Sequence, residues 1–280
     1  MTRPVALITG ASAGIGAAAV ESFAAAGYDV VLAARRLDRL QQAAAAAASR
    51  HPQAQILPLA CDVDSDAAVQ AAFGAVSKRF GALDVLVNNA GFGTYGAIAD
   101  TPLEIFRANM ETNFFGAVRC TQAALPLLRA AAERSTRRWG AAIVMVSSFV
   151  GRRAMPVMAP YSASKFALEG FSAALRVELW DERISVSVVN PGVTRTDFVE
   201  AAQGKRPANF LPPEGGMSPE AVAAEILRAV SRPRRNRYLT GWGKAGMALE
   251  WLAPGAFDRL LLRTWRRAKG SAKDEGRRSK

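Results

Sequence analysis

Short apolar runs alternate along the chain with longer segments of helical character. The runs indicate buried strands at 5–8, 30–34, 55–60, 84–91 (ending in a small-residue turn), 141–146, 184–189 and 237–240. Helices are expected between them: from the first turn to about 26, at 37–50, about 64–80, after Pro102, about 110–132, around 161 to about 182, and from 219. This alternation predicts an α/β fold, with a three-layer, doubly wound parallel sheet of about seven strands covered by helices on both faces.

A glycine-rich turn follows the first strand and opens a helix. Its sequence is Thr9-Gly10-Ala11-Ser12-Ala13-Gly14-Ile15-Gly16. Glycine lets the backbone approach a pyrophosphate closely, and a helix N-terminus presents free N–H groups to an anion. The context therefore predicts a Rossmann-type dinucleotide-binding sheet, with its cofactor contacts at Gly10, Ser12, Gly14, Ile15 and Gly16.

The end of the second strand indicates which dinucleotide is bound. Folds that prefer NAD usually carry an acid there for the ribose 2′-hydroxyl, but this chain has Ala34, followed by Arg35 and Arg36. An arginine holds a 2′-phosphate through charge-assisted hydrogen bonds. We therefore expect NADP as the cofactor, with NAD less favoured. The alternative is that these arginines only solvate the start of a helix.

Small and polar residues also follow the next two strands. Asp62 and Val63 come after the third strand, and Asn89, Ala90 and Gly91 after the fourth. Asp62 has two open interpretations, an acceptor for the adenine amino group or the cap of the following helix. In parallel sheets ligands bind at the carboxyl ends of strands, so these positions are predicted to meet at one edge.

The candidate chemistry lies beyond the fifth strand, in the run from Ser147 to Lys165. Tyr161 and Lys165 are four residues apart and share one face of a helix. A neighbouring ammonium favours the phenolate and is expected to lower the tyrosine pKa, which creates an acid/base device. Ser148 can bring a second hydroxyl to the same substrate oxygen.

Two loops complete the predicted site. The turn after the sixth strand supplies Pro191, Gly192, Val193, Thr194 and Thr196 as further cofactor contacts. Residues 197–217 are rich in glycine and proline and suit a mobile substrate lid. Some apolar side chains are expected near the site, and they form either the rim of an apolar substrate pocket or part of the hydrophobic core. They are Met155, Pro156, Val157, Met158 and Phe198.

Composition narrows the classes of function. Two cysteines are too few for a disulfide framework, and a single histidine makes a histidine-based metal or triad site unexpected. No signal peptide or spanning segment is recognised, so a cytoplasmic protein is expected. From residue 232 onward 14 Lys and Arg face 4 Asp and Glu, so this tail supplies +10 of the net +12. A nearly neutral body argues against nucleic-acid binding.

The basic tail is predicted to be an appendage to one catalytic domain at 1–245. It comprises a basic amphipathic helical extension at 246–269 and a disordered end at 270–280. Within 254–268 one helical face carries Phe257, Leu260, Leu261, Thr264 and Trp265, and arginines occupy another. This helix either lies on an anionic membrane surface or docks its apolar face on protein.

Taken together, these motifs resemble the short-chain dehydrogenase/reductase family, in its branch with a core of about 250 residues. The matching positions run in family order over roughly 4–240: the Gly10–Gly16 turn, Asn88-Asn89-Ala90-Gly91, Asn113, Ser148, Tyr161-x-x-x-Lys165 and Pro191-Gly192. The family's other basic position for NADP, just before the second motif glycine, is Ala13 here. The resemblance supports Arg35 as the position that distinguishes NADP from NAD.

The resemblance implies roles for these residues. Tyr161 is expected as general acid/base, Ser148 as a hydrogen-bond donor to the substrate carbonyl, Lys165 as a ligand of the nicotinamide ribose and Asn113 as a brace. An NADP(H)-dependent oxidoreductase follows, acting on an apolar small-molecule carbonyl or secondary alcohol whose size stays open, as a homodimer or homotetramer. The alternative is a nucleotide-sensing scaffold on the same fold, whose tail recruits a membrane or a partner.

Overall fold

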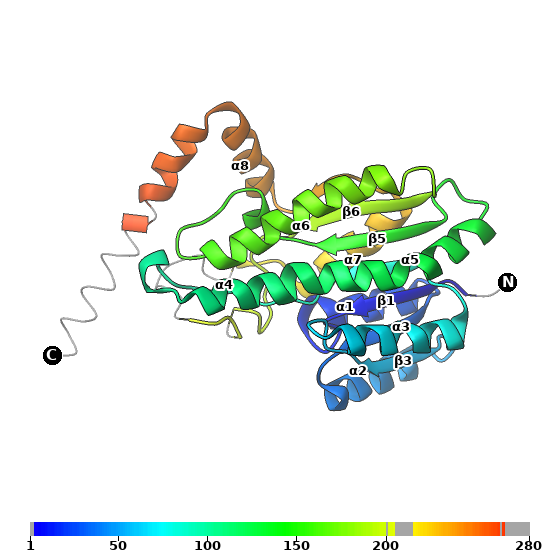
Figure 1. The fold of residues 1–280 in the computed structure, drawn as a ribbon. Coiled ribbons are helices and arrows are strands. Elements are labelled where there is room, and N and C mark those ends of the chain that lie inside the picture. The colour runs from blue at the N-terminus through cyan, green and yellow to red at the C-terminus, as the bar shows by residue number, and fades with distance from the viewer. Residues whose placement is uncertain (1–2, 200, 205–214, 264, 267–280) are drawn as a thin grey trace.

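The sheet predicted from the apolar runs is present as one parallel sheet. A computed structural model describes residues 3–199, 201–204, 215–263 and 265–266 (Figure 1). Seven strands are ordered β3-β2-β1-β4-β5-β6-β7, and every neighbouring pair is parallel. They are β1 (Val5–Thr9), β2 (Asp29–Ala34), β3 (Ile56–Ala60), β4 (Val85–Asn88), β5 (Ala141–Val146), β6 (Ile184–Asn190) and β7 (Asn236–Tyr238).

Helices cover both faces of this sheet, which confirms the doubly wound architecture (Figure 1). One face carries α3 (Asp66–Phe80), α5 (Gly116–Arg134) and α6 (Ala159–Glu178). The other carries α1 (Gly14–Ala25), α2 (Leu37–Arg50) and α7 (Pro219–Ser231). The order changes direction between β1 and β4, so the carboxyl ends of these central strands border the crevice where such sheets bind ligands.

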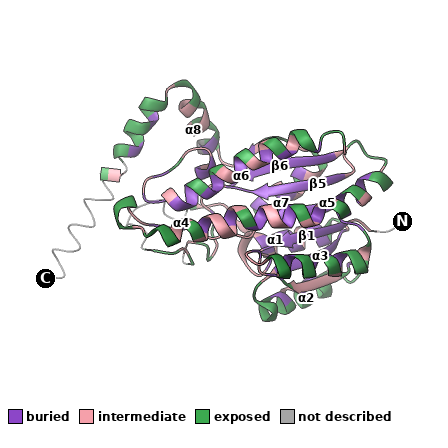
Figure 2. Cartoon of the chain, viewed as in Figure 1, coloured by how far each residue is buried: buried purple, intermediate pink, exposed green. Residues whose placement is uncertain are grey.

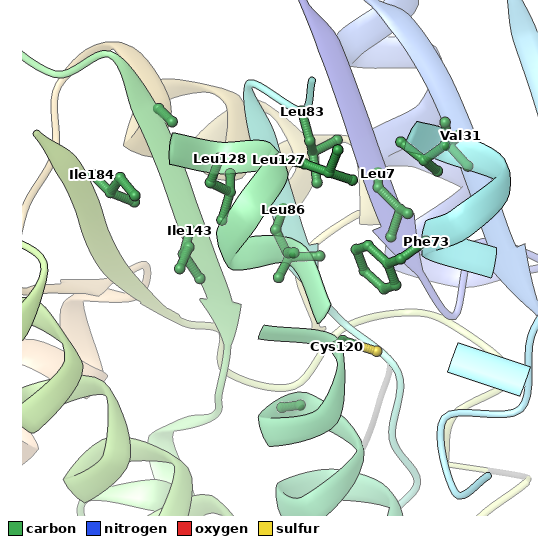
Figure 3. Close-up of a cluster of buried hydrophobic side chains, with 14 of the residues drawn as sticks. Leu7, Val31, Phe73, Leu83, Leu86, Cys120, Leu127, Leu128, Ile143 and Ile184 are labelled. Atoms are coloured by element: carbon green, nitrogen blue, oxygen red, sulfur yellow. The ribbon is translucent and has the colours of Figure 1, made fainter. Parts of the chain in front are cut away.

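Alternation along the strands divides the apolar core in two. In β1, Leu7 packs with the α3–α5–α6 layer and Ile8 with the α1–α2–α7 layer, because successive side chains point to opposite faces. Figure 3 shows Leu7, Leu86, Ile143 and Leu128 within the first layer. Figure 2 shows buried strands between helices that expose their outer faces. This core fixes the strand ends that carry the site.

Several boundaries differ from the sequence-based expectation. Helix α6 ends at Glu178 instead of about 182, and a turn leads to Arg183, whose φ is +57°. Helix α3 begins at Asp66, where Ser65 accepts a hydrogen bond from the Ala68 amide at 3.3 Å. Ser65 is therefore the cap, and the interpretation of Asp62 as the helix cap is wrong.

The region expected to form two helical stretches after Pro102 is one continuous path. It contains α4 (Leu103–Met110), a turn of π-helix at Glu111–Phe115 and then α5. A π-turn adds a residue to the helix and redirects the side chains within it, and such turns are frequent at functional sites. Short 3₁₀ turns lie at Ile98–Asp100 and Phe149–Gly151.

The C-terminal region is helical from Gly241, earlier than the predicted boundary at 246. Helix α8 (Gly241–Leu252) is followed by a second helix at 254–263, and together they arch away from the end to which the strands point (Figure 1). The predicted disordered end at 270–280 and most of the predicted lid, 205–214, lie outside the described residues. None of the helices in the described ranges is long and apolar enough to cross a membrane.

Candidate functional site

The glycine turn places a helix N-terminus at the carboxyl end of the sheet. Helix α1 begins at Gly14 after Ala13, and no side chain caps its first turn. The N–H groups of that turn are therefore left for a ligand, as a phosphate site requires. Ser12 is half-buried within the turn, while Ile15 packs against the core and anchors the start of the helix. The chemistry of this turn fits the diphosphate of a dinucleotide.

Backbone contacts leave no room for a side chain at two glycines of this turn, Gly10 and Gly16. Gly10 has φ +65°, and a Cβ there would lie 2.9 Å from the Ala90 Cα. A Cβ on Gly16 would lie 2.3 Å from the Gly10 carbonyl oxygen. The sequence therefore needs glycine at these two positions for packing as well as for access by a ligand.

Hydrogen bonds from Asn89 and Thr9 join the ends of β1 and β4. The Asn89 side chain donates to the Thr9 carbonyl at 2.9 Å. The Thr9 hydroxyl accepts from the amides of Asn89 at 2.9 Å and Ala90 at 3.0 Å, and it donates to the Val87 carbonyl at 3.3 Å. The role of the Thr9 hydroxyl was not predicted. The sequence feature that could have indicated this role is the position of Thr9, a polar residue at the end of an apolar strand.

The residues expected at the adenosine end lie close together after β2 and β3. Arg35 and Arg36 are exposed, and neither side chain forms a hydrogen bond or ion pair with the part of the chain that the structure describes. Arg35 is close enough to Asp64 to influence it electrostatically: burial raises the pKa of Asp64, and the Arg35 charge counteracts this. Asp62 accepts from the Asp64 amide at 3.2 Å. Val63 is buried against α5, where a Cβ on Gly116 would lie 2.7 Å from Val63 Cγ2.

The proposed acid/base group is a buried tyrosine near the end of β5. Tyr161 is 6% exposed and lies in the first turn of α6, and Ser148 is the second residue after β5. Burial raises the pKa of Tyr161 to about 12, hydrogen bonding with the Ser148 side chain lowers it, and the neighbouring Tyr95 raises it. The two hydroxyl groups therefore share one space, as the sequence-based hypothesis requires.

Lys165 lies behind this pair, one helical turn from Tyr161. Its Nζ is 5.8 Å from the centre of the Tyr161 ring and donates to the Val146 carbonyl at 2.9 Å. Burial lowers the pKa of Lys165 to about 8, against the charge of Glu169, which raises it. The expectation that Lys165 lowers the Tyr161 pKa is wrong for the protein by itself. Desolvation of the phenol dominates, and the ammonium is directed toward a carbonyl.

The π-turn brings Asn113 to the same place. Its side-chain oxygen accepts from the Phe92 amide at 2.9 Å, and its nitrogen donates to the Phe92 carbonyl at 3.0 Å and the Ser164 hydroxyl at 2.9 Å. A Cβ on Gly91 would lie 2.7 Å from Asn113 Oδ1 and 3.6 Å from Lys165 Nζ. Asn113 thus connects the segment after β4 to helix α6, which carries Tyr161 and Lys165.

The loop after β6 closes the site on its other side. Pro191 accepts from the Phe149 amide at 3.1 Å, and a Cβ on Gly192 would lie 3.0 Å from Thr240 Cγ2. Thr196 lies against the glycine turn, because its Cγ2 is 3.1 Å from the Cβ position of Gly14. The other two residues predicted to contact the cofactor, Val193 and Thr194, pair with Met217. The Val193 carbonyl accepts from the Met217 amide at 2.9 Å, and Thr194 forms a β-bridge with Met217.

Apolar side chains surround Tyr161 on the side opposite the glycine turn. The ring centres of Phe198 and Tyr161 are 5.7 Å apart, and Gln203 pairs with the strand-like segment at Thr94. The beginning of the predicted lid, at Phe198, thus lies against Tyr161. Sequence reasoning left open whether Met155, Val157 and Met158 are rim or core. They are buried in one cluster with Tyr161, together with Tyr95, Val150, Phe257 and Leu261.

Two features of this region were missed. Glu169, buried at 5% exposed, forms an ion pair with Arg152 at 3.1 Å one turn beyond Lys165; spacing along the helix was the signal. Phe257 and Leu261 were predicted as a membrane or docking face, and they are buried beside Tyr161. Of the two interpretations of the tail, membrane contact and docking on protein, these two side chains therefore fit the second. Nothing in the sequence indicated the site as their partner.

Comparisons with known proteins agree with this geometry. The family model described as short chain dehydrogenase matches residues 4–207. Dehydrogenase/reductase SDR family member 7B of Bos taurus is 34% identical over 276 residues, which cover 95% of this chain and 83% of that protein.

Solved structures give the same result. A short-chain dehydrogenase from Streptomyces avermitilis is 30% identical with a TM-score of 0.76, and the match covers 98% of each chain. L-Sorbose reductase from Gluconobacter frateurii, solved with NADPH and L-sorbose, is 30% identical with a TM-score of 0.74, covering 86% of this chain and 96% of that one. The family model spans most of the chain and the relatives span nearly all of it. The chain belongs to the short-chain dehydrogenase/reductase family.

Proposed function

We propose that this protein is an NADPH-dependent oxidoreductase that interconverts an apolar carbonyl compound and the corresponding secondary alcohol. The observation that carries the proposal is the shared position of the Ser148 and Tyr161 hydroxyls, buried beside Lys165 at the carboxyl edge of the sheet. Two hydroxyls that reach one oxygen atom polarise a carbonyl and exchange a proton with it. A scaffold protein has no need to bury such a pair.

The residues of the chain have separate tasks in this reaction. The nicotinamide cofactor supplies the hydride. Ser148 donates a hydrogen bond to the substrate oxygen, and Tyr161 gives its proton to that oxygen as negative charge develops in reduction, or removes it in oxidation. A phenol whose pKa is raised to about 12 is fully protonated at neutral pH and ready as an acid. Lys165 lies behind it, with Asn113 fixing the end of β4 beside the ammonium.

Replacing the phenol tests the mechanism. Tyr161→Phe keeps the ring and its packing against Phe198 but removes the proton, so kcat for NADPH oxidation with an active carbonyl compound should fall by about 10³-fold or more. Tyr28→Phe is the matched control, because Tyr28 directly precedes β2 and so lies at the amino end of the strands, away from the site. Turnover of Tyr161→Phe within tenfold of the parent would contradict the proposed role.

NADP preference is supported by exposed cations and by the lack of an acid after β2. The L-sorbose reductase relative was solved with NADPH, and an alcohol dehydrogenase from Thermococcus sibiricus, 26% identical, with 5-hydroxy-NADP. Arg35→Ala should raise KM for NADPH about 10- to 100-fold, because a charge-assisted bond is lost, and should change KM for NADH little. Arg39→Ala, on the exposed start of α2, is the control. Equal changes for both cofactors would remove Arg35 from this role.

We further propose a cytoplasmic homodimer or homotetramer. Apolar side chains on the outer faces of the π-turn and α6 support association, since Phe115, Phe166 and Val177 are 44%, 44% and 76% exposed. Sedimentation at micromolar concentration should give more than a monomer. Peripheral membrane contact through 254–268 has weaker support, because two of the apolar residues expected to face the membrane, Phe257 and Leu261, are buried on protein.

A further inference from the structure

The C-terminal segment, residues 241–263, lies beyond the part of the chain that the family model matches, which ends at 207. It nevertheless packs on the loop that follows the catalytic Ser148. The 3₁₀ turn Phe149–Gly151 begins directly after Ser148, and the contacts of Phe149 and Arg153 with the segment start there. Any shift of this segment therefore acts on the substrate side of the site.

Two glycines let α8 approach this loop closely. Gly243 and Gly246 are three residues apart on one face of the helix, and that face lies on the Phe149 ring. A Cβ on Gly246 would be 3.2 Å from Phe149 Cζ and 3.5 Å from Phe257 Cζ. A Cβ on Gly243 would be 3.6 Å from Phe149 Cδ2. Phe149 is thus held between the catalytic strand β5 and the C-terminal segment.

The helix at 254–263 then buries one apolar face in the cluster that contains Tyr161. Phe257 is 6% exposed and Leu261 9% exposed, and both belong to the buried cluster that contains Tyr161, Tyr95 and Met155. The adjacent Leu262 is 42% exposed. The i, i+4 pair Phe257 and Leu261 is therefore the inward face of this helix, and it reaches the same cluster as the catalytic phenol.

Arg153 fixes the segment by three contacts. Its guanidinium forms an ion pair with Glu250 at 2.9 Å and another with Asp258, and it lies 4.8 Å from the centre of the Phe257 ring. The Arg153 side chain is only 14% exposed, so these interactions are less screened than surface pairs. One arginine of the loop after Ser148 thus binds both helices of the C-terminal segment.

We propose that the C-terminal segment forms the outer wall of the substrate site, with Phe257 and Leu261 as specificity-determining residues and Arg153 as a positioning residue. The proposal rests on the proposed function and extends it to the substrate. The cluster around Tyr161 is made of aromatic, aliphatic and methionine side chains. It therefore selects carbonyl compounds that carry an extended apolar group, and it discriminates against small or polyhydroxylated ones.

Alanine substitutions at the adjacent residues Leu261 and Leu262 test whether the C-terminal segment lines the substrate site. Purified enzyme with NADPH is assayed on 2-butanone, 2-hexanone and 2-decanone. The parent should show kcat/KM rising with chain length, and Leu261→Ala should lower kcat/KM for 2-decanone about tenfold while changing that for 2-butanone less than twofold. Leu262→Ala, the exposed control, should keep the parent profile.

The outcomes separate this proposal from the function on which it rests. No turnover of any carbonyl compound by the parent protein overturns the proposed function and the wall with it. Turnover with the same length profile in the Leu261→Ala and Leu262→Ala variants overturns the wall alone. An equal fall for all three ketones in Leu261→Ala also overturns it, because that result marks a general loss of structure.

A measurement without substrate tests Arg153. Arg153→Gln should increase amide hydrogen exchange at 254–263 about tenfold or more and leave exchange in β1 and β4 unchanged, because the segment loses its ion pairs while the core keeps its contacts. The same variant should raise KM for 2-decanone more than it lowers kcat. Arg259→Gln, an exposed residue of the same helix, is the control. Unchanged exchange in Arg153→Gln overturns the positioning role.

Discussion

The cofactor side and the substrate side of this site are built from different parts of the chain. On the cofactor side, backbone approaches backbone: the Gly10–Gly16 turn lies on Ala90 and is tied by Asn89 and Thr9. On the substrate side, large side chains from loops and from the C-terminal segment pack around Tyr161. At Gly10 and Gly16 the cofactor side has no room for an added carbon atom. The substrate side consists of apolar side chains that other apolar side chains can replace.

This difference separates chemistry from specificity. In the proposed reaction the hydride donor must be held in one geometry, and the turn proposed to hold it is fixed by close approaches, under 3 Å, that only glycine permits at Gly10 and Gly16. The shape of the substrate is set by the side chains around Met155, Met158 and Leu261, where one apolar residue replaces another at modest cost. Substitutions on the two sides should therefore differ in size and in kind.

The largest effect is expected on the cofactor side. Gly16→Ala places a Cβ 2.3 Å from the Gly10 carbonyl oxygen and 2.8 Å from Asn89 Nδ2, so the backbone of the turn must move. We expect unfolding free energy to fall by about 3 kcal/mol and the Kd for NADPH to rise about 100-fold or more. Urea denaturation and fluorescence titration with NADPH measure the two quantities.

A second glycine provides the control for that substitution. Gly74 lies within α3, and a Cβ there would meet no atom within 4 Å. Gly74→Ala should therefore raise the unfolding free energy by about 0.5–1 kcal/mol through helix propensity alone and leave NADPH binding unchanged. If Gly16→Ala binds NADPH as tightly as Gly74→Ala does, the view of the turn as a rigid cradle is wrong.

An intermediate effect is expected where the two sides meet, at Lys165. Burial lowers its pKa from 10.5 to about 8, so the unfolded chain binds a proton more readily than the folded one between these values. This lysine's contribution to stability is therefore greatest above pH 10.5 and is lost as the pH falls through about 8. At pH 7 the buried ammonium costs stability, of the order of 2 kcal/mol.

Removing that charge should separate stability from activity. Lys165→Met should raise the unfolding free energy at pH 7 by roughly 2 kcal/mol, with the advantage shrinking between about pH 8 and 10.5, while catalytic activity falls. Urea denaturation at several pH values measures this. Lys165→Arg keeps a cation and serves as the comparison. A Lys165→Met protein that is less stable than the parent at pH 7 would show that the bond to Val146 outweighs desolvation.

The same division decides how much the sequence could predict. Periodicity located the seven strands within a few residues, because buried parallel strands are near-continuous apolar runs such as 141–146. The glycine turn and Ser148 were predicted at one edge because each follows a strand, and the pair Tyr161 and Lys165 was predicted beside them on the next helix. Asn113 was assigned from the family resemblance and not from a local pattern. Local patterns suffice where local backbone geometry makes the site.

Contacts between distant parts of the chain were not predictable in this way. The amphipathic pattern of 254–268 showed that Phe257 and Leu261 share a face, but not that the face meets Tyr161, nearly a hundred residues earlier. The pKa of Tyr161 was predicted to fall because a cation is one turn away. It rises because tertiary packing buries the phenol, which sequence spacing cannot reveal.

The smallest expected effect concerns backbone strain on the substrate side. Val157 has φ +60°, a conformation that a β-branched residue rarely adopts, while its side chain is buried beside Tyr161 and its carbonyl accepts from the Gly96 amide at 2.8 Å. Such strain costs of the order of 1 kcal/mol, and glycine relieves it. Val157→Gly should therefore be more stable than Val157→Ala by about 1 kcal/mol, although glycine has the greater chain entropy to lose.

At Val150, in the 3₁₀ turn of the same cluster, φ is not positive and the order should be the usual one, with Ala more stable than Gly by about 0.5–1 kcal/mol. Urea denaturation of the four variants measures both differences. At each position the alanine and the glycine variant both lose most of the valine side chain, so the loss of packing is nearly equal in the two. Their difference in unfolding free energy therefore reports the backbone conformation. If the alanine variant is the more stable protein at both positions, the backbone of Val157 is not strained, and the proposed strain on the substrate side is wrong.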